Sequence, residues 1–372
     1  MKQTRAERRA APKPAHIASG DRPISPSGEV AHSRAERRAA PKPARIPSGD
    51  SPMYPSGEGL HIAIMTDETG WHTRQLQAAL RARGASGRCV DLADCHIDTA
   101  QAWHGLVVPG FGRDLPDAAL VRGIAGGSFE QVTKRLGVLH ALRELGVPVY
   151  NDARAIERSV DKSMTSLLLH AADIPTPPTW ATESLAQARR IAMREGAAGH
   201  ALVLKPLFGS QGKGLQLVGD VAGVHHPVPE LGEAYGSLAY LQRFVPAATD
   251  PGFDWRVLVV GARAVTAMRR VSDGWIHNVA QGARCEPAEL TPALAALAER
   301  AAAALEMDYA GVDMIPCAGG GIQVLEVNGV AAWQGLQRVT SFNIARAIVD
   351  DLLDRKLAAA HAGGVAGTGR RA

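Results

Sequence analysis

Two short apolar segments, separated by a glycine turn, carry acidic residues near the C-terminus. Residues 313–328 read DMIPCAGGGIQVLEVN, with Asp313 on the first segment and Glu326 and Asn328 on the second. Side chains two apart on a strand face the same way, so Glu326 and Asn328 project together, and strand pairing brings Asp313 beside them. Two carboxylates and an amide oxygen suit a hard divalent cation that bridges phosphates. These residues alone leave two interpretations open, a metal site or a hairpin with a polar face.

A glycine-rich loop lies between two other apolar runs, in the stretch LVLKPLFGSQGKGLQLV at 202–218. The loop consists of Gly209, Ser210, Gln211, Gly212, Lys213 and Gly214. It is not a Walker A loop, because Leu207 and Gly214 stand where that motif needs Gly and Ser or Thr, and Leu217 breaks a G-x-G-x-x-G pattern. Glycine N–H groups can still cradle an anion, and Lys205 and Lys213 supply charge. A plain hairpin is the alternative.

Further segments follow in the order expected for the ATP-grasp superfamily, which the chain resembles from about residue 60 to about 355. They are RAIERSVDKSMTSLLLHAADIPTPPTW with Lys162, AYLQRFV at 239–245, FDWRVLVVGARAVTAMRRV with Asp254, Arg269 and Arg270, and HNVAQGA with Asn278. In that superfamily a lysine-bearing strand and a flexible glycine loop clamp the triphosphate against a metal-binding strand pair. The resemblance therefore implies ATP and Mg²⁺ as cofactors, with Mn²⁺ as an alternative ion.

The resemblance also implies a role for each residue of the expected site. Arg270 and Lys205 are the catalytic residues, and Asp313, Glu326 and Asn328 are the metal ligands. The expected nucleotide-binding residues are Lys162, Lys205, Gly209, Ser210, Gln211, Gly212, Lys213, Gly214, Gln242, Arg243, Phe244, Val245, Asp254 and Asn278. Arg269 is expected in a cationic pocket that holds the extra carboxylate of the amine substrate.

Within the superfamily the chain looks most like the RimK-like ligases, which add L-glutamate to a carboxylate acceptor. The segments GSFEQVTKRLGVLHALRELGVPVYNDARAIERSVDKS and GLQRVTSFNIARAIVDDLL are similar to a branch that accompanies tetrahydromethanopterin-dependent one-carbon metabolism. Two departures bear on the substrates. Arg243 stands in the hinge where many relatives carry an acid, and Gly329-Val330-Ala331-Ala332-Trp333 replaces the proline-glycine turn that usually follows the metal asparagine.

The implied activity is ATP- and Mg²⁺-dependent ligation of a carboxylate to an amine through an acyl phosphate. The expected partners are an amino acid, with L-glutamate as first choice, and a small-molecule (pterin cofactor) or peptide carboxylate. Two alternatives remain open at this point, an ATP-grasp kinase that phosphorylates a hydroxyl and a nucleotide-binding regulatory protein without turnover.

The expected fold class is α/β, an ATP-grasp fold preceded by a parallel pre-ATP-grasp domain. The expected divisions are a disordered basic head at 1–58, the pre-ATP-grasp domain at 59–155, a small lid subdomain at 156–240, a nucleotide and metal subdomain at 241–357, and a disordered tail at 358–372. Strands predicted at 60–66, 87–92, 105–110 and 147–151 alternate with helices at 71–83 and 129–145, which favours a parallel sheet. Further helices are predicted at 160–171, 185–195, 292–305 and 344–356.

Basic charge is concentrated in the head, where RAERRAAPKPA occurs at 5–15 and again at 34–44. Residues 1–58 hold eleven Lys/Arg and six Asp/Glu, a net of +5, so the rest of the +4 chain carries −1. The head is rich in Pro, Gly, Ser, Ala and Arg, which predicts disorder. The nearly neutral remainder argues against nucleic acid as a partner.

The chain has no run of 18 apolar residues, so no membrane partner is expected. Its cysteines Cys89, Cys95, Cys285 and Cys317 lack the spacing of a zinc site or a disulfide framework. We therefore predict a cytoplasmic protein with free thiols, and a homo-oligomer stays open.

Overall fold

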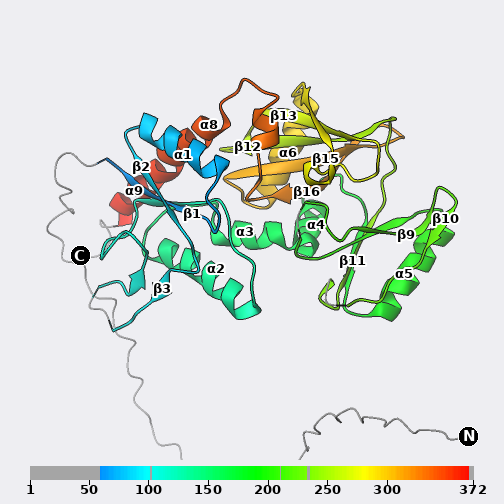
Figure 1. Ribbon diagram of the computed structural model, residues 1–372, viewed down its shortest axis with the longest axis horizontal. Coiled ribbons are helices and arrows are strands. Elements are labelled where there is room, and N and C mark those ends of the chain that lie inside the picture. The colour runs from blue at the N-terminus through cyan, green and yellow to red at the C-terminus, as the bar shows by residue number, and fades with distance from the viewer. Residues whose placement is uncertain (1–58, 101–102, 210, 233–234, 368–372) are drawn as a thin grey trace, which may run out of the picture. The chain divides into compact units, whose positions relative to one another are not determined.

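The computed structural model describes residues 59–100, 103–209, 211–232 and 235–367, with side chains as far as 362 (Figure 1). The basic head, Ser210 and residues 368–372 lie outside the described residues, and so do the expectations placed on them. Among the helices that are described, none has both the length and the apolar character needed to cross a membrane.

Four parallel strands form the first sheet, in the order β2-β1-β5-β6. Their bounds are Ser86–Val90 for β2, His61–Met65 for β1, Ala118–Val121 for β5 and Val149–Tyr150 for β6. Helix α1 (Trp71–Ala82) packs against β2, and α2 (Phe129–Glu144) packs against β6. The predicted parallel sheet is confirmed.

The prediction that the segment 105–110 belongs to that sheet is wrong. The segment 105–110 forms β4 (Leu106–Val107), which pairs antiparallel with β3 (His96–Ile97) in a separate two-stranded sheet. The fourth strand of the parallel sheet is instead β5, a buried run of four apolar residues that pairs with β1. A run this short has no periodicity that separates a strand from a loop, so only pairing with β1 identifies it.

The helix predicted at 160–171 is also divided differently. It consists of the end of α3 (Ala153–Val160) and of α4 (Lys162–Ala171), with Asp161 between them. The Asp161 carboxylate accepts the N–H groups of Ser163 and Met164 at 2.8 and 3.1 Å. Asp161 therefore caps α4, and Lys162 stands in its first turn.

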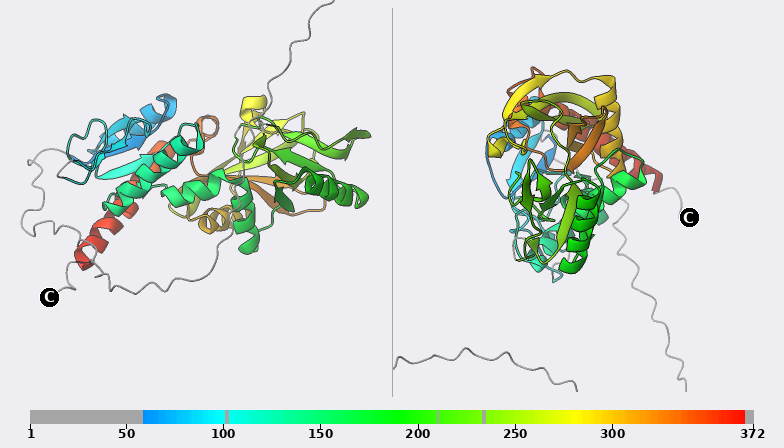
Figure 2. Two further views of the ribbon diagram at one scale, coloured as in Figure 1. Left: turned by 90° about the horizontal axis from the view of Figure 1, so that it is seen from below. Right: turned by 90° about the vertical axis from the view of Figure 1, so that its right-hand side faces the viewer.

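The second sheet, called the small sheet below, is antiparallel, in the order β10-β9-β8-β11-β7. Its strands span Val224–His226 (β10), Gln216–Val221 (β9), Leu202–Lys205 (β8), Ala239–Arg243 (β11) and Thr179–Thr182 (β7). Helix α5 (Leu185–Ala197) packs along it (Figure 2). The expected subdomain boundary between residues 240 and 241 falls inside β11. Because β11 pairs with both β8 and β7, the whole strand belongs to the small sheet and the boundary follows Arg243.

The third sheet, called the large sheet below, is antiparallel, in the order β14-β13-β12-β15-β16. Its strands span Arg284–Ala288 (β14), Arg263–Ser272 (β13), Gly252–Val260 (β12), Tyr309–Pro316 (β15) and Ile322–Asn328 (β16). Its strands β15 and β16 form the acidic hairpin, which carries Asp313, Glu326 and Asn328. Helix α6 (Pro292–Ala304) packs on β12, β13, β15 and β16. Short helices η2 (Val279–Gln281) and α7 (Gln334–Gln337) lie in the connections.

The chain closes with three consecutive helical segments, α8 (Ile344–Asp351), the π-helical η3 (Leu352–Leu357) and α9 (Ala358–Gly367). Helix α8 packs on α1 and β12, so one apolar core joins the parallel sheet and α1 to the large sheet. The expectation of disorder from residue 358 is wrong as far as Gly367. Four of the first five α9 residues are alanine, which has the highest helix propensity, and the segment continues η3 without a break.

Candidate functional site

Residues from the small and the large sheet line one cleft, whose empty space is about 860 Å³ including its open mouth. The expected site residues that line it are Lys162, Lys205, Gly209, Gln211, Gly212, Lys213, Gln242, Arg243, Phe244, Val245, Asp254, Arg270, Asn278, Asp313 and Glu326. Gly214, Asn328 and Arg269 are not in its lining. Side chains from segments as distant as 162 and 326 thus converge on one space.

The acidic hairpin has the predicted strand–turn–strand form. Asp313 of β15 stands directly opposite Glu326 of β16, next to a register shift, and Gly311 stands opposite Asn328. The Asn328 amide Nδ2 donates to Asp313 Oδ2 at 3.4 Å, which leaves its carbonyl oxygen available as a ligand. The three predicted metal ligands are therefore neighbours, although Asn328 is not among the residues that line the cleft.

Asp313 is not an isolated carboxylate but part of a buried chain of alternating charges. Arg256 binds both of its oxygens at 2.7 Å, and Arg270 Nη2 lies 3.1 Å away. Arg270 in turn binds both oxygens of Asp254 at 2.7 and 2.5 Å. Burial raises the pKa of Asp254, and burial also acts to raise that of Asp313, but Arg256 and Arg270 outweigh it and hold the Asp313 pKa below its usual range. Asp313 is thus kept as an anion.

The donor set fits a magnesium ion that is shared with phosphate groups. Among the described residues, no group of three or more His, Cys, Asp or Glu side chains forms a closed metal cage. Mg²⁺ is usually held by one or two carboxylates together with water and substrate phosphates, so a cage is not required. Asp313, Glu326 and the Asn328 carbonyl supply the hard oxygen ligands that such an ion prefers.

Two lysines face the acidic hairpin from the other side of the cleft. Lys162 Nζ lies 3.9 Å from Glu326 Oε1. It also donates to the carbonyl of Leu207, just before the glycine loop, and to that of Gly209, the first residue of the loop. Lys205 Nζ donates to Gln242 Oε1 at 2.6 Å, which leaves the buried Gln242 Nε2 without a partner. Burial, with a smaller contribution from Lys162, lowers the pKa of Lys205 to about 8, against the opposing effect of Glu326. Both groups carry charge that an anionic ligand would stabilise.

The glycine loop approaches the opposite wall closely. Gly212 has a φ of +71°, and a Cβ there would lie 2.6 Å from Asn278 Oδ1 and 3.0 Å from Ile276 Cγ2. Gln281 Nε2 also donates to the Gln211 carbonyl at 3.2 Å. A side chain at 212 is therefore excluded both by conformation and by space, which explains the glycine.

Two of the expected arginines differ from the expectation in their contacts. Arg243 lines the cleft, but its guanidinium is bound by Glu195 of α5 at 2.7 Å. Arg269, which is expected in a cationic substrate pocket, pairs with Glu286 at 3.0 Å and lies over the Phe253 ring at 5.4 Å, and it is not part of the lining of this cleft. Its neighbour Arg270 faces the cleft, and successive strand residues point to opposite faces.

Sequence reasoning missed one residue that pairs with a cleft carboxylate and one that lines the cleft. Arg256 forms the bidentate pair with Asp313, and His277 lines the cleft with its buried Nε2 lacking a partner. Arg256 could have been found, because Asp254 and Arg256 are two apart on one strand and so share a face. His277 follows no strand pattern, so only the folded loop brings it to the cleft.

Two family models together cover nearly all of the described chain. The RimK PreATP-grasp domain matches residues 60–156, and the RimK-like ATP-grasp domain matches residues 159–352. The boundary between these matches falls at α3, between the parallel sheet and the segment that carries Lys162.

Relatives that are matched over most of their own length carry ligase names. The tetrahydromethanopterin:alpha-L-glutamate ligase of Methanosarcina acetivorans is 30% identical over an alignment of 322 residues, which covers 77% of this chain and 97% of the relative. The corresponding protein of Methanococcus maripaludis is 34% identical over 237 residues, 63% of this chain and 78% of the relative. A probable alpha-L-glutamate ligase of Cellvibrio japonicus is 31% identical over 284 residues, 75% of this chain and 90% of the relative.

Solved structures agree on the fold. A RimK domain ATP-grasp protein from Sphaerobacter thermophilus has a TM-score of 0.56 and 24% identity, covering 78% of this chain and 98% of its own. The ATP-grasp ligase PsnB, solved with a minimal precursor, Mg and ADP, has a TM-score of 0.58 and 21% identity over 79% and 98% of the two chains. Since its family models and relatives span both the parallel domain and the cleft-bearing sheets, this chain belongs to the RimK-like ATP-grasp family.

Proposed function

We propose that this protein is an ATP- and Mg²⁺-dependent carboxylate–amine ligase that adds L-glutamate to a carboxylate acceptor. The observation that carries the proposal is the convergence of Lys162 and Lys205 on the acidic hairpin in one cleft, with Lys162 Nζ 3.9 Å from Glu326 Oε1. Relatives named as glutamate ligases support the amine, and the Methanosarcina acetivorans relative, matched over 97% of its length, supports a pterin acceptor. A peptide carboxylate is the second choice.

The chemistry follows from the poor reactivity of a carboxylate toward an amine at neutral pH. The acceptor carboxylate attacks the γ-phosphorus of ATP, ADP leaves, and an acyl phosphate forms. The amine nitrogen then attacks the acyl carbon, inorganic phosphate leaves, and the nitrogen loses its proton. Because the phosphate supplies the leaving group, no side-chain nucleophile is needed, and the protein acts by positioning and by neutralising charge.

The expected site residues have the following parts in that scheme. Lys162, Lys205 and the glycine loop hold the phosphates, and Gln242 to Val245 meet the base. Arg270, which is buried between Asp254 and Asp313, stabilises charge on the transferring group. Asp313, Glu326 and Asn328 would hold Mg²⁺, which neutralises phosphate charge when bound. We also propose that Mn²⁺ substitutes for it and that the protein acts in the cytoplasm.

The products of the reaction test this proposal directly. We expect ADP and inorganic phosphate, no AMP, and phosphate release that requires both an acceptor and L-glutamate. Tetrahydromethanopterin and a glutamate-terminated peptide are the acceptors to compare. With hydroxylamine in place of glutamate, a hydroxamate of the acceptor should accumulate, because hydroxylamine captures acyl phosphates.

Other product patterns would identify other functions. A stable phosphorylated acceptor without phosphate release would make the protein a kinase. AMP and pyrophosphate would exclude the acyl-phosphate route. Nucleotide binding with no turnover across the acceptor and amino-acid panel would favour a regulatory protein.

The lowered pKa of Lys205 predicts how nucleotide affinity depends on pH. The free protein loses the Lys205 charge as pH rises through about 8, whereas bound phosphate favours the charged form. Affinity for ADP should therefore fall above pH 8, by at most about tenfold per pH unit. The unfolded chain keeps this proton up to about pH 10.5, so the cost of burying the charged Lys205 is relieved, and the stability of the free protein rises, as pH increases from 8 to 10.5.

Calorimetric titration of ADP between pH 7 and pH 10 would measure this dependence, using wild type and Lys205→Arg. The arginine stays charged throughout, so its profile should be flatter. Lys213→Arg is the control, because Lys213 lines the same cleft but is exposed. Equal slopes for all three proteins would show that Lys205 does not titrate in the binding step.

A further inference from the structure

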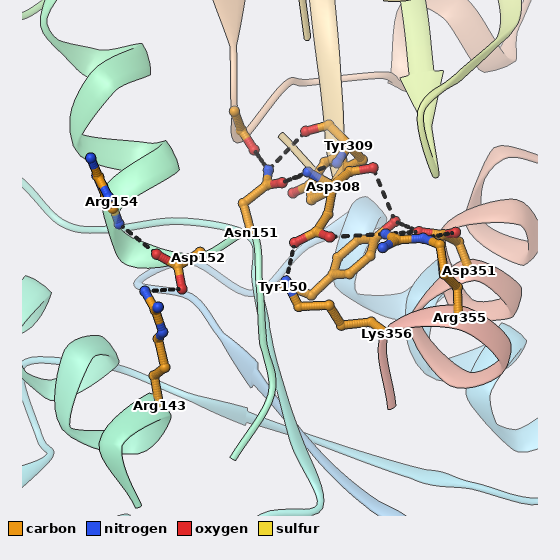
Figure 3. Close-up of polar contacts among 11 residues, drawn as sticks. Arg143, Tyr150, Asn151, Asp152, Arg154, Asp308, Tyr309, Asp351, Arg355 and Lys356 are labelled. Carbon is orange, nitrogen blue, oxygen red and sulfur yellow. Dashed lines mark hydrogen bonds and ion pairs between the residues drawn. The ribbon is translucent and has the colours of Figure 1, made fainter. Parts of the chain in front are cut away.

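The side chain of Asn151 binds the backbone at both ends of the acidic hairpin (Figure 3). Its Oδ1 accepts the N–H groups of Asp308 and Tyr309 at 2.6 and 3.0 Å. Its Nδ2 donates to the carbonyls of Tyr309 and Gly329 at 2.8 and 2.6 Å. Tyr309 is the first residue of β15, and Gly329 follows Asn328 at the end of β16.

These four contacts use the whole hydrogen-bonding capacity of a primary amide, which has two N–H donors and an oxygen with two lone pairs. Asn151 is also 0% exposed, so water does not replace a lost contact. It lies just after β6, within the pre-ATP-grasp domain. A side chain of one domain therefore holds together the ends of the two strands, β15 and β16, on which Asp313 and Asn328 lie in the other domain.

Two more side chains of the pre-ATP-grasp domain hold the loop that follows Asn328. Arg122 Nη1 donates to the Val330 carbonyl at 2.9 Å. His72 Nε2 accepts the N–H groups of Trp333 and Gln334 at 3.1 and 3.2 Å. Burial, together with Arg122, lowers the pKa of His72 to about 4, so the ring is neutral and Nε2 can accept. The loop backbone is thus fixed largely from outside its own domain.

We infer that Asn151 is a positioning residue for the metal-binding hairpin, acting from the pre-ATP-grasp domain on Asn328 and on the strand of Asp313. This inference rests on the proposed function, because it assigns Asn151 to the same metal site. Groups that orient metal ligands without touching the ion typically change metal affinity or activity about 10–100-fold when they are replaced. Asn151 stands in that relation to the hairpin.

Asn151→Asp tests the inference with almost no change in shape. The carboxylate still accepts the N–H groups of Asp308 and Tyr309, but its second oxygen faces the carbonyls of Tyr309 and Gly329, which need a donor. The strand end at Gly329 should therefore move away from β15. We expect the gain in ADP affinity that magnesium provides to shrink about tenfold, with ADP affinity in EDTA changed less than about twofold.

The measurement is calorimetric titration with ADP, in magnesium chloride and in EDTA, at a temperature where circular dichroism shows every variant folded. It reads metal-assisted binding without turnover. Turnover measured in parallel should show kcat lowered about tenfold and KM for ATP changed less. A residue with only a structural role would lower the melting temperature and leave the magnesium-dependent gain unchanged.

Tyr150→Phe is the matched control. Tyr150 is the neighbouring residue, is equally buried, and donates to Asp351 of α8 at 2.6 Å in the same polar network (Figure 3). Its loss should destabilise the protein yet keep the magnesium-dependent gain. If Asn151→Asp does not fold, Arg122→Gln removes the neighbouring loop contact from a half-buried position and should reduce the gain in the same direction.

The possible results distinguish an error in the proposed metal site from an error in the role of Asn151. If the ADP affinity of the wild-type protein does not depend on magnesium, the proposed metal site itself is overturned. A magnesium-dependent wild type, with an equal gain in folded Asn151→Asp or, failing that, in Arg122→Gln, would overturn only the role of Asn151. An equal reduction in Tyr150→Phe would also overturn it, because general loosening of the network would then be the cause.

Discussion

Replacing Glu326 with glutamine is expected to slow ATP turnover by about 10²–10³-fold while the protein still folds. Glu326 stands opposite Asp313 in the hairpin and lines the cleft, and its side chain is 28% exposed. The substitution therefore removes one charge with little change in buried contacts. Steady-state ADP release, together with a thermal melt, measures activity and fold in the same preparation.

Glu286→Gln is the matched control for that substitution. Glu286 also lies on the large sheet with a 35% exposed side chain, but it pairs with Arg269 away from the cleft. It should turn over at a rate close to that of the wild type. If Glu326→Gln also turned over at close to the wild-type rate, Glu326 would not be a metal ligand, and the hairpin would be interpreted as a structural element with a polar face.

Replacing Arg270 with methionine should have the largest effect on stability. The Arg270 side chain is 4% exposed and binds Asp254 at 2.5 Å and Asp313 at 3.1 Å. Its loss leaves two buried carboxylates without this partner, although Asp313 keeps Arg256. Removing one member of a buried ion pair typically costs about 3–5 kcal/mol of the free energy of unfolding. Denaturant unfolding measures that loss.

Two further variants show whether a buried carboxylate without a charge partner causes the loss of stability. Arg269→Met removes the adjacent arginine, whose 43% exposed side chain forms a surface pair, and should cost at most about 1 kcal/mol. Adding Asp254→Asn to Arg270→Met should restore part of the lost stability, because one of the two carboxylates becomes neutral. Purely additive losses in the double variant would instead point to packing.

Much of this site could be predicted from the sequence, because its residues lie in local patterns. Alternation on β16 puts Glu326 and Asn328 on one face, and the glycine turn between two apolar runs specifies the hairpin with Asp313. The glycine loop between β8 and β9 follows from the same kind of pattern. Side-chain direction along a strand repeats every two residues, so short stretches are sufficient to specify it.

Contacts between distant segments could not be predicted in this way. The pairing of Asp313 with Arg256 and Arg270, the turn of Arg269 toward Glu286, and the place of β5 beside β1 each depend on which strands become neighbours. The four bonds of Asn151 join segments more than 150 residues apart. The sequence by itself therefore determined the chemical groups of the site and their local orientation. Tertiary structure decided which charges are neutralised and what holds the ligands in place, because strand order and burial arise only when the sheets assemble.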